Sequence, residues 1–599
     1  MDNRRERFYG IWMLPEIISC LLVLISLLWD VFFLRQVPQV IGDASILNSE
    51  FAMLACLVWL NSSIVLIHSI VYFKREKKLP TFVFLQLFVG LLTSIAFICY
   101  HGDLRWMDGN FWSFGLGVVG SIIIGVFGLI NIHDYWQLKR EKKEKVNSSA
   151  WSPAVIFFSY TFSFIVLSSL ILMTPAATYD GISLPDAFFM TASAATSTGL
   201  IALDVPNTFT PLGKAVILMD IQMGAIGLMT FAYFVLMMVG KKLAVQNSAN
   251  VSGLLDQDGL GVVPSLIKAL VSVTLLTELA GAVLLYFFWY GEPGVPQDHL
   301  WIYAAFHSIS AFCCAGISLF PNNMAESCVA YNKFSQSVMM TLMMMGMLGF
   351  GVYLELISRV CKRIKGVRVP ARWSTHCWLA TQSMLIATII CMVVLALLGI
   401  FEVSAHEQSA TNTIWEALWN SVGRSSGFNI TTVDDYGFTY KFFLIFAMMI
   451  GGNPAGTGGG FFAPVLAICI LEVWRVLRGK QDLEIHQRRI AKTTIRRAMV
   501  TVVIGTAWLY LMTMVFMLLE PDIAAMPNGF QRIMFEVTSA FSTCGFSLGI
   551  TSQLSDVSKI LLAMNMIFGR IGVFTFMMLF VRQSQKKLLR YPETKLPLS

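Results

Sequence analysis

Charge is scarce in this chain. Of its 599 residues only 13% are charged and 56% are hydrophobic, and the mean hydropathy is +0.67. Polar stretches are all shorter than a few tens of residues, which leaves no room in this sequence for a soluble nucleotide-binding domain. Apolar runs of roughly 20 residues recur along the whole chain, and a helix needs this length to cross a bilayer. The composition therefore predicts an integral membrane protein built from helices.

Motifs of catalysis and of metal binding are also missing. The sequence has no H-E-x-x-H and no paired acidic motif in its apolar runs, so we expect no enzyme activity. The 11 cysteines show no paired metal spacing, and we expect no cofactor in this chain. The glycine-rich segment 451–460 lacks the Lys-Ser/Thr pair of a phosphate-binding loop.

The few charges are distributed asymmetrically, because basic clusters alternate along the chain with neutral or acidic loops. The positive-inside rule assigns the basic side, and with it both termini, to the cytoplasm. These clusters stand only at the ends of apolar runs, so membrane lipid is the expected partner and nucleic acid is not. The basic clusters are Arg4–Arg7, Lys74–Lys78, Lys139–Lys145, Lys241–Lys242, Arg359–Arg372, Arg475–Arg497 and Arg582–Arg590.

The pattern of apolar runs divides the chain into five parts. Residues 1–149 are expected to hold about four membrane helices and a cytoplasmic linker, and the residues suggest no function for these helices beyond packing or lipid contact. The four expected helices lie near 11–34, 51–73, 80–100 and 111–136. A longer pattern then repeats four times, in units that cover 150–250, 251–370, 371–490 and 491–599.

Each repeat has a long apolar run, a shorter apolar segment that ends in small residues and a glycine, and a second long run. The sequence thus predicts an all-α polytopic membrane protein with four pseudo-symmetric helix–pore-loop–helix repeats around one pore. The expected ranges are 153–175, 185–198 and 211–240; 264–290, 301–314 and 334–360; 376–400, 413–425 and 439–477; and 497–519, 530–543 and 555–582.

The four shorter segments cannot cross a bilayer, so each is expected to enter from the outside and to end near the middle of the membrane. A non-helical turn is tolerated there only if it is buried in protein or lines water. The C-terminus of a helix carries about −0.5 of an elementary charge, so four such ends around one cavity favour a cation. Four turns can also supply a ring of backbone carbonyls that replaces the hydration shell of a monovalent cation.

Gly199, Gly316, Gly427 and Gly545 stand in these turns, where glycine reaches unusual φ/ψ values at little steric cost. We therefore predict a selectivity filter for a monovalent cation, and the alternative is that each glycine only ends a helix. The other residues predicted to line the filter are Ser197, Thr198, Cys314, Ala315, Ser425, Ser426, Thr543 and Cys544. Arg424 directly precedes the third turn, which it is expected to brace by hydrogen bonds.

Five further strings carry a family resemblance. They are MDIQMGAIGLMTF (219–231), HSISAFCCAGISLF (307–320), MLGFGVYLELISR (347–359), GGNPAGTGGG (451–460) and FGRIGVFTF (568–576). Together with the four turns, they make residues 150–582 resemble the Trk/Ktr/HKT family of potassium transporters. The resemblance implies a potassium uptake subunit of the bacterial inner membrane, a homodimer, and a separate cytoplasmic regulatory subunit that binds nucleotide.

The resemblance also bears on ion choice. In this family a glycine in all four turns goes with potassium, and a serine in the first turn goes with sodium. The resemblance therefore implies, through Gly199, that K⁺ is the ion bound at the filter residues. A sodium-selective transporter, or a potassium transporter coupled to sodium, is the alternative. The second turn has Cys313–Cys314 where the family more often has asparagine, which changes side chains more than carbonyls.

The glycine-rich segment and Arg570 are the expected gate. Six glycines and a proline in ten residues cannot continue a helix. The resemblance makes this segment a flexible loop that obstructs the pore, and the alternative is a helix kink. Its glycines are Gly451, Gly452, Gly456, Gly458, Gly459 and Gly460. Arg570 lies within the last apolar run, at a cost of at least ~2.5–3.5 kcal/mol unless it is paired or wet. The resemblance makes it a barrier that faces the pore, whereas a snorkelling or structurally paired arginine is the alternative.

Overall fold

The computed structural model describes residues 153–227, 263–364, 366, 373–402, 410–454, 456–485 and 488–572. The four helices predicted within residues 1–149 lie outside the described residues. So do the C-terminal ends of the predicted second spans of the first and fourth repeats, 228–240 and 573–582.

Each repeat has three principal helices. The long first helices are α6 (Pro153–Leu172), α12 (Val263–Trp289), α17 (Thr375–Glu402) and α21 (Lys492–Leu519). The short second helices are α7 (Leu184–Ala195), α13 (Leu300–Phe312), α18 (Ala410–Gly423) and α23 (Gly529–Phe541). The third helices are α9 (Pro211–Ile226), α15 (Lys333–Met347), α19 (Phe438–Met449) and α24 (Asp556–Ile571). The short helices match their predicted ranges to within three residues.

Small elements lie in the connections between these helices. They are α8 (Val205–Thr208), α14 (Ser327–Ala330), α22 (Pro521–Ala524) and the single 3₁₀ turns η2 (Gln297–His299), η3 (Asn323–Ala325), η4 (Val433–Asp435) and η5 (Thr551–Gln553). Strands β1 (Glu484–Ile485) and β2 (Arg488–Arg489) pair as an antiparallel hairpin. The described residues are otherwise helical, as the all-α prediction has it, and the hairpin adds only two strands of two residues each.

Two of the third helices do not run straight on. The sequence predicts one continuous span over 334–360, but α15 ends at Met347 and α16 (Phe350–Ile364) continues at an angle of 91°. That prediction is wrong because Gly349, at φ +81°, takes a left-handed conformation that no helix residue adopts. In the third repeat, residues 450–462 form a loop between α19 and α20 (Ala463–Leu477). A mere helix kink at this place is therefore excluded.

Local sequence explains where the first short helix begins. The Ser183 hydroxyl accepts a hydrogen bond from the backbone N–H of Asp186, which caps α7, and Pro185 occupies its first turn. Proline is tolerated there because its missing N–H would have no partner within the helix.

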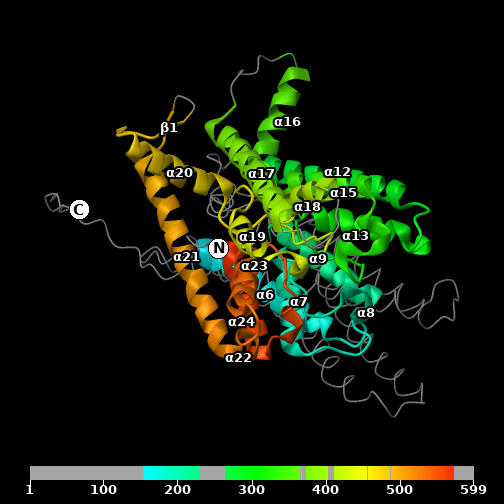
Figure 1. Cartoon of the computed structure of the whole chain (residues 1–599). Coiled ribbons are helices and arrows are strands. Elements are labelled where there is room, and N and C mark those ends of the chain that lie inside the picture. The colour runs from blue at the N-terminus through cyan, green and yellow to red at the C-terminus, as the bar shows by residue number, and fades with distance from the viewer. Residues whose placement is uncertain are drawn as a thin grey trace, which may run out of the picture.

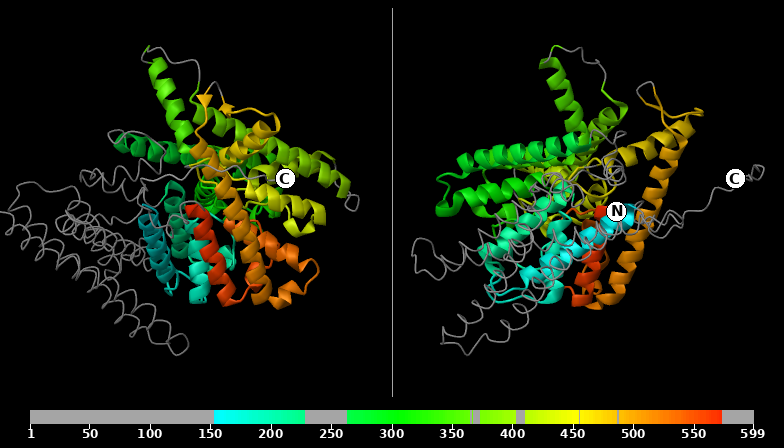
Figure 2. Two further views of the ribbon diagram at one scale, coloured as in Figure 1. Left: turned by 90° about the vertical axis from the view of Figure 1, so that its left-hand side faces the viewer. Right: turned by 180° about the vertical axis from the view of Figure 1, so that it is seen from behind.

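Long apolar helices surround the short ones. By length and composition, the candidate membrane spans among the described residues are α17, α21 and the part of α12 from Val271 to Trp289. The bent pair of α15 and α16 is a fourth candidate if the two helices count as one span. In Figures 1 and 2 α16 and the β1–β2 hairpin project at one end of the molecule, while α22 lies at the opposite end. The described basic residues Lys362 and Arg363 of α16 and Arg488 and Arg489 of β2 thus lie at one end, and the acidic connection around Asp522 lies at the other.

Candidate functional site: a ring of four glycine turns

The four glycine turns pack against one another in a closed ring. In each turn, the glycine faces the carbonyl oxygen of the residue that precedes the glycine of the next turn. A Cβ on the glycine would lie within 2.7 Å of that oxygen, so only glycine fits. The pairs are Gly199 with Ala315 (2.2 Å), Gly316 with Ser426 (2.2 Å), Gly427 with Cys544 (2.7 Å) and Gly545 with Thr198 (2.1 Å). The last pair returns to the first turn and closes the ring.

Three of the turns share one backbone geometry, and the third turn departs from it. The residue two positions before the glycine has a positive φ in the first, second and fourth turns, at Ser197 (52°), Cys314 (53°) and Thr543 (45°). Ser425, at the same position of the third turn, is not among the residues with positive φ. The short helices themselves do not differ in this respect, because all four end four residues before the turn glycine, at Ala195, Phe312, Gly423 and Phe541.

All twelve residues predicted to line the filter lie in this ring and are buried. Within the described residues, the carbonyl oxygens of the residues that directly precede the four glycines accept no hydrogen bond. The hydroxyl groups of Ser197, Ser425 and Thr543 are also buried without a partner there. Buried polar groups are nearly always hydrogen-bonded, so this cluster of unsatisfied oxygens is unusual. It provides a set of acceptors without competing donors, which is the chemistry that a cation requires.

The loop 450–462 docks beneath this ring, into the break between α15 and α16. The backbone N–H of Asn453 donates to the Met347 carbonyl at 3.0 Å, and that of Thr457 donates to the Gly346 carbonyl at 3.1 Å. The Thr457 hydroxyl donates to the carbonyl oxygen of Phe312, the last residue of α13, at 3.1 Å. The loop is therefore bonded both to the broken helix and to the end of a short helix that leads into the ring.

Close packing explains most of the glycines in this loop. A Cβ on Gly459 would lie 1.9 Å from the Thr543 hydroxyl oxygen, and one on Gly456 would lie 2.9 Å from the Met347 carbonyl. Of the six glycines predicted as gate residues only Gly460, at φ +79°, has a positive φ. The sequence suggests glycine for flexibility, whereas the structure gives it a second reason, which is the lack of room for side chains.

Arg570 connects this loop to two helices. From α24 its guanidinium donates to the carbonyl oxygen of Thr457 and, at 3.0 Å, to that of Gly224 in α9. No described carboxylate forms an ion pair with it. The side chain is thus held inside the protein by two backbone oxygens, and the alternative of a snorkelling arginine does not fit this geometry. The prediction that it faces a pore stays a prediction.

Arg424 braces the third turn, as the sequence predicts. Its side chain is fully buried and donates to the carbonyl of Ser421, to the hydroxyl of Thr388 in α17 at 3.2 Å, and to the carbonyl of Ile450 at 3.1 Å. Because Ile450 begins the loop 450–462, this one guanidinium joins the third turn to the loop.

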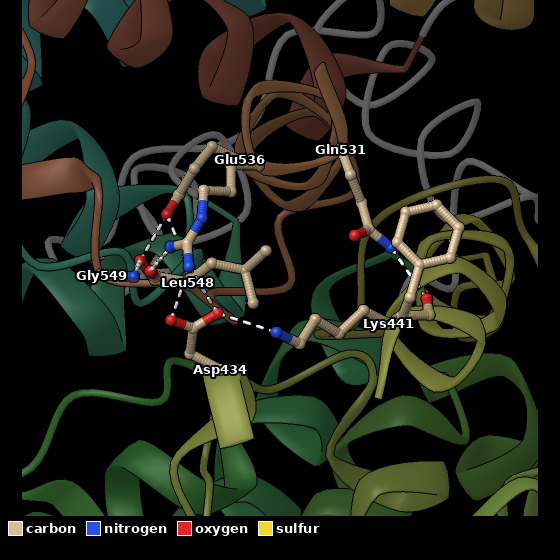
Figure 3. A network of polar contacts seen from close by, with 9 residues as sticks. Asp434, Lys441, Gln531, Glu536, Leu548 and Gly549 are labelled. Atoms are coloured by element: carbon tan, nitrogen blue, oxygen red, sulfur yellow. Dashed lines mark hydrogen bonds and ion pairs between the residues drawn. The ribbon is translucent and has the colours of Figure 1, made fainter. Parts of the chain in front are cut away.

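A polar network outside the ring ties the third and fourth repeats together. Asp434, which follows the third turn, forms ion pairs with Lys441 at 2.8 Å and with Arg532 of α23 at 2.7 Å. Arg532 also donates to the carbonyl of Leu548, which follows the fourth turn, at 3.0 Å. Figure 3 shows the carboxylate of Asp434 with the Lys441 side chain directed toward it and Leu548 close by. Sequence reasoning did not identify these residues, since they are isolated charges in loops and helix starts.

Comparisons with known proteins agree with this geometry. The sequence model of the TrkH family, described as cation transport protein, matches residues 121–591. Ktr system potassium uptake protein B from Bacillus subtilis (strain 168) is 30% identical over 467 residues, which cover 76% of this chain and 98% of that protein. Its namesake from Vibrio alginolyticus is 29% identical over 460 residues, which cover 76% of this chain and 95% of that protein.

The fold is also similar to a solved one. The crystal structure of the potassium transporter TrkH from Vibrio parahaemolyticus matches with a TM-score of 0.61 at 17% sequence identity, and the match covers 83% of this chain and 97% of that chain. At this identity the likeness shows the fold alone, whereas the family match extends over most of the sequence. The chain therefore belongs to the TrkH family of cation transport proteins, which are integral membrane transporters and not enzymes.

Proposed function

We propose that this chain takes up K⁺ across the inner membrane of a bacterium, and that the ring of four glycine turns is its selectivity filter. The single observation that carries the proposal is the closed series of contacts between each glycine and the carbonyl before the next. Four segments far apart in the sequence meet at one place, and the carbonyl oxygens directly before their glycines accept no hydrogen bond from the described residues. A ring of carbonyl oxygens can replace the water around a K⁺ ion.

Electrostatics supports a cation rather than an anion. The C-terminal ends of α7, α13, α18 and α23 all lead into the ring. Each end carries a partial negative charge, and four of them add in a site from which protein excludes water. No metal cofactor is needed in this account, because K⁺ is the transported ion and is bound only in passage.

The loop 450–462 and Arg570 form the gate in this proposal. The loop lies directly against the ring, as the approach of Gly459 to Thr543 and the bond from Thr457 to Phe312 indicate. In this position it obstructs the path of an ion. Arg570 holds the loop there through the Thr457 carbonyl and adds a positive charge that opposes cations. Opening requires the loop to leave these contacts.

A second subunit would drive this opening. Two relatives are named as B proteins of a Ktr system, which supports a partner for this chain. We propose a cytoplasmic, nucleotide-binding regulatory subunit that docks on the end formed by α16 and the β1–β2 hairpin, where the basic clusters lie. In this proposal the chain forms a homodimer, both of its termini are cytoplasmic, and the helices within 1–149 add membrane contact.

Growth rescue tests the function. The chain is expressed, with its cognate regulatory subunit, in a bacterial strain that lacks potassium uptake, and growth is titrated against external K⁺ and Na⁺. We expect growth at low external K⁺ that Na⁺ does not replace. Uptake of Na⁺ instead, or a strict requirement for Na⁺ during K⁺ uptake, would favour the sodium alternative. No rescue by protein that is present in the membrane would contradict the proposal.

A further inference from the structure

A serine stands six residues before the glycine in every turn of the ring. In the first repeat this is Ser193, whose hydroxyl accepts a hydrogen bond from the N–H of Gly199 at 3.1 Å and donates to the carbonyl of Leu200 at 2.7 Å. The backbone carbonyl of Ser193 also accepts from the N–H of Thr198, at 2.8 Å. One serine thus fixes three consecutive residues of the turn.

The second and fourth repeats each make part of the same set of bonds. The Ser310 hydroxyl donates to the carbonyl of Ile317 at 2.8 Å, which is the position that Leu200 has in the first repeat. The Ser539 hydroxyl accepts from the N–H of Gly545 at 3.0 Å. The backbone carbonyls of Ser310 and Ser539 accept hydrogen bonds from the N–H of the residue before the glycine, which is Ala315 (2.8 Å) and Cys544 (2.9 Å). All three serines are fully buried, so water does not compete for these bonds.

The third repeat has the serine but does not use it in this way. The Ser421 hydroxyl points to the outer helix α17, where it donates to the carbonyl of Thr388 at 2.6 Å. The carbonyl of the residue after the glycine, Phe428, instead accepts a hydrogen bond from the indole N–H of Trp419 at 2.8 Å. Phe428 follows the turn glycine, as Leu200 and Ile317 do in their repeats. Trp419 is fully buried as well.

We propose that Ser193, Ser310, Ser539 and Trp419 are positioning residues that set the K⁺ selectivity of the ring. This inference rests on the proposed function. In the first three repeats the donor binds the carbonyl after the glycine and so turns it away from the ring, which leaves the carbonyl before the glycine as the ion ligand. In the fourth repeat Ser539 fixes the glycine N–H instead. None of these four side chains is itself an ion ligand.

The physical reason is the rigidity of the ring. On the cavity-size account of K⁺/Na⁺ discrimination, the carbonyls must be held so that they do not follow the smaller ion inward. A turn that loses its brace has more freedom to contract. A net hydrogen bond is worth enough to change an equilibrium by about two- to tenfold. We therefore expect single variants to lower the K⁺/Na⁺ permeability ratio by about two- to tenfold.

The experiment uses matched serines. Ser193→Ala, Ser310→Ala and Ser539→Ala are compared with Ser421→Ala, whose serine has the same place in its repeat but bonds to α17. Each purified full-length variant is reconstituted into vesicles with its regulatory subunit, and K⁺ and Na⁺ fluxes are measured with the melting temperature. The first three variants should lose selectivity, and Ser421→Ala should keep the wild-type ratio. Trp419→Phe, which keeps the apolar ring but loses the N–H, should behave like the first three.

The outcomes separate this inference from the proposed function. Wild-type protein that shows no K⁺ preference would contradict the proposed function. A selective wild type, together with folded alanine variants and a folded Trp419→Phe variant that all keep its ratio, would overturn the inference alone. An equal loss in Ser421→Ala would also overturn it, since the effect would then be a general one. If an alanine variant does not fold, the cysteine variant with its weaker donor replaces it, and an unchanged ratio there counts against the inference.

Discussion

Lys559 in α24 forms an ion pair with Asp186 in α7, and the distance between Nζ and Oδ1 is 2.7 Å. The two residues are 373 positions apart, and their side chains are only 11% and 15% exposed. The last repeat is thereby fastened to the first short helix, at the same seam where Gly545 meets the carbonyl of Thr198. At this seam the first and the fourth repeats contact each other although they are not consecutive in the sequence.

Neutralising either partner of this ion pair should loosen the seam. Asp186→Asn and Lys559→Met each leave a mostly buried charge unpaired, so we expect each to lower stability by about 1–3 kcal/mol, between the values of exposed and buried pairs. The melting temperature in detergent measures this. The double variant should lose less than the sum of the two single variants. Strictly additive losses would show that the two charges do not interact.

The ring can be tested with two glycines of the same repeat. Gly545 has φ +92° and faces the Thr198 carbonyl, whereas Gly549 has φ +80° and has no atom within 4 Å of an added Cβ. Gly549→Ala therefore introduces backbone strain of about 1–2 kcal/mol without a clash. Gly545→Ala introduces both. We expect only Gly545→Ala to change the K⁺/Na⁺ flux ratio, and equal flux ratios in the two variants would show that the close approach has no part in selectivity.

The gate assignment predicts that the loop is released when its bonds are removed. Arg570→Ala deletes the donors to Thr457 and Gly224, and Thr457→Val deletes the hydroxyl that donates to Phe312. Both variants should raise K⁺ flux in the absence of the regulatory subunit, and Arg570→Ala should raise it more because a positive charge is lost as well. Flux and melting temperature are measured on one preparation. Lower stability without any gain of flux would make Arg570 a structural link only.

The network outside the ring predicts a dependence on pH. Burial alone would raise the pKa of Asp434, but hydrogen bonds and charges from Lys441 and Arg532 outweigh it and hold the pKa below its ordinary value. A carboxyl with a depressed pKa contributes stability above its unfolded pKa of about 4, and this contribution is lost as the pH falls through the folded pKa. Asp434→Asn should therefore lower the melting temperature at pH 7, and the difference from wild type should shrink below about pH 4. A difference that does not vary with pH would contradict this reading.

The sequence predicted the helices well where local chemistry marks their ends. Pro185 marks the start of α7, and the small residues before each glycine mark the ends of all four short helices. The continuous span over 334–360 was predicted wrongly because its apolar pattern runs through Gly346 and Gly349 without interruption. Those glycines leave room for the loop of another repeat, since a Cβ on Gly346 would lie 2.5 Å from the Thr457 hydroxyl oxygen and one on Gly349 would lie 2.8 Å from the Pro454 carbonyl oxygen. Such a requirement comes from tertiary contacts, which a single helix pattern does not contain.

The site was only partly predictable for the same reason. The glycines and their small neighbours stand out as a fourfold pattern, and so do the four serines six residues earlier, although sequence analysis did not single these out. Ser421 bonds to α17 and Trp419 takes its place at the turn, and such tertiary contacts cannot be read from the spacing of residues. The third repeat looks like the others in sequence and differs in its contacts.

The account stands on the claim that the four turns form a K⁺ filter. The most direct test compares K⁺ and Na⁺ fluxes into vesicles that contain purified wild-type protein or the Gly199→Ser variant, with the regulatory subunit present. A side chain at Gly199 would lie against the Ala315 carbonyl and would distort the ring. The account predicts a flux of K⁺ well above that of Na⁺ in the wild type, and a clear fall of this ratio in the variant. A folded Gly199→Ser variant with the wild-type ratio would contradict it.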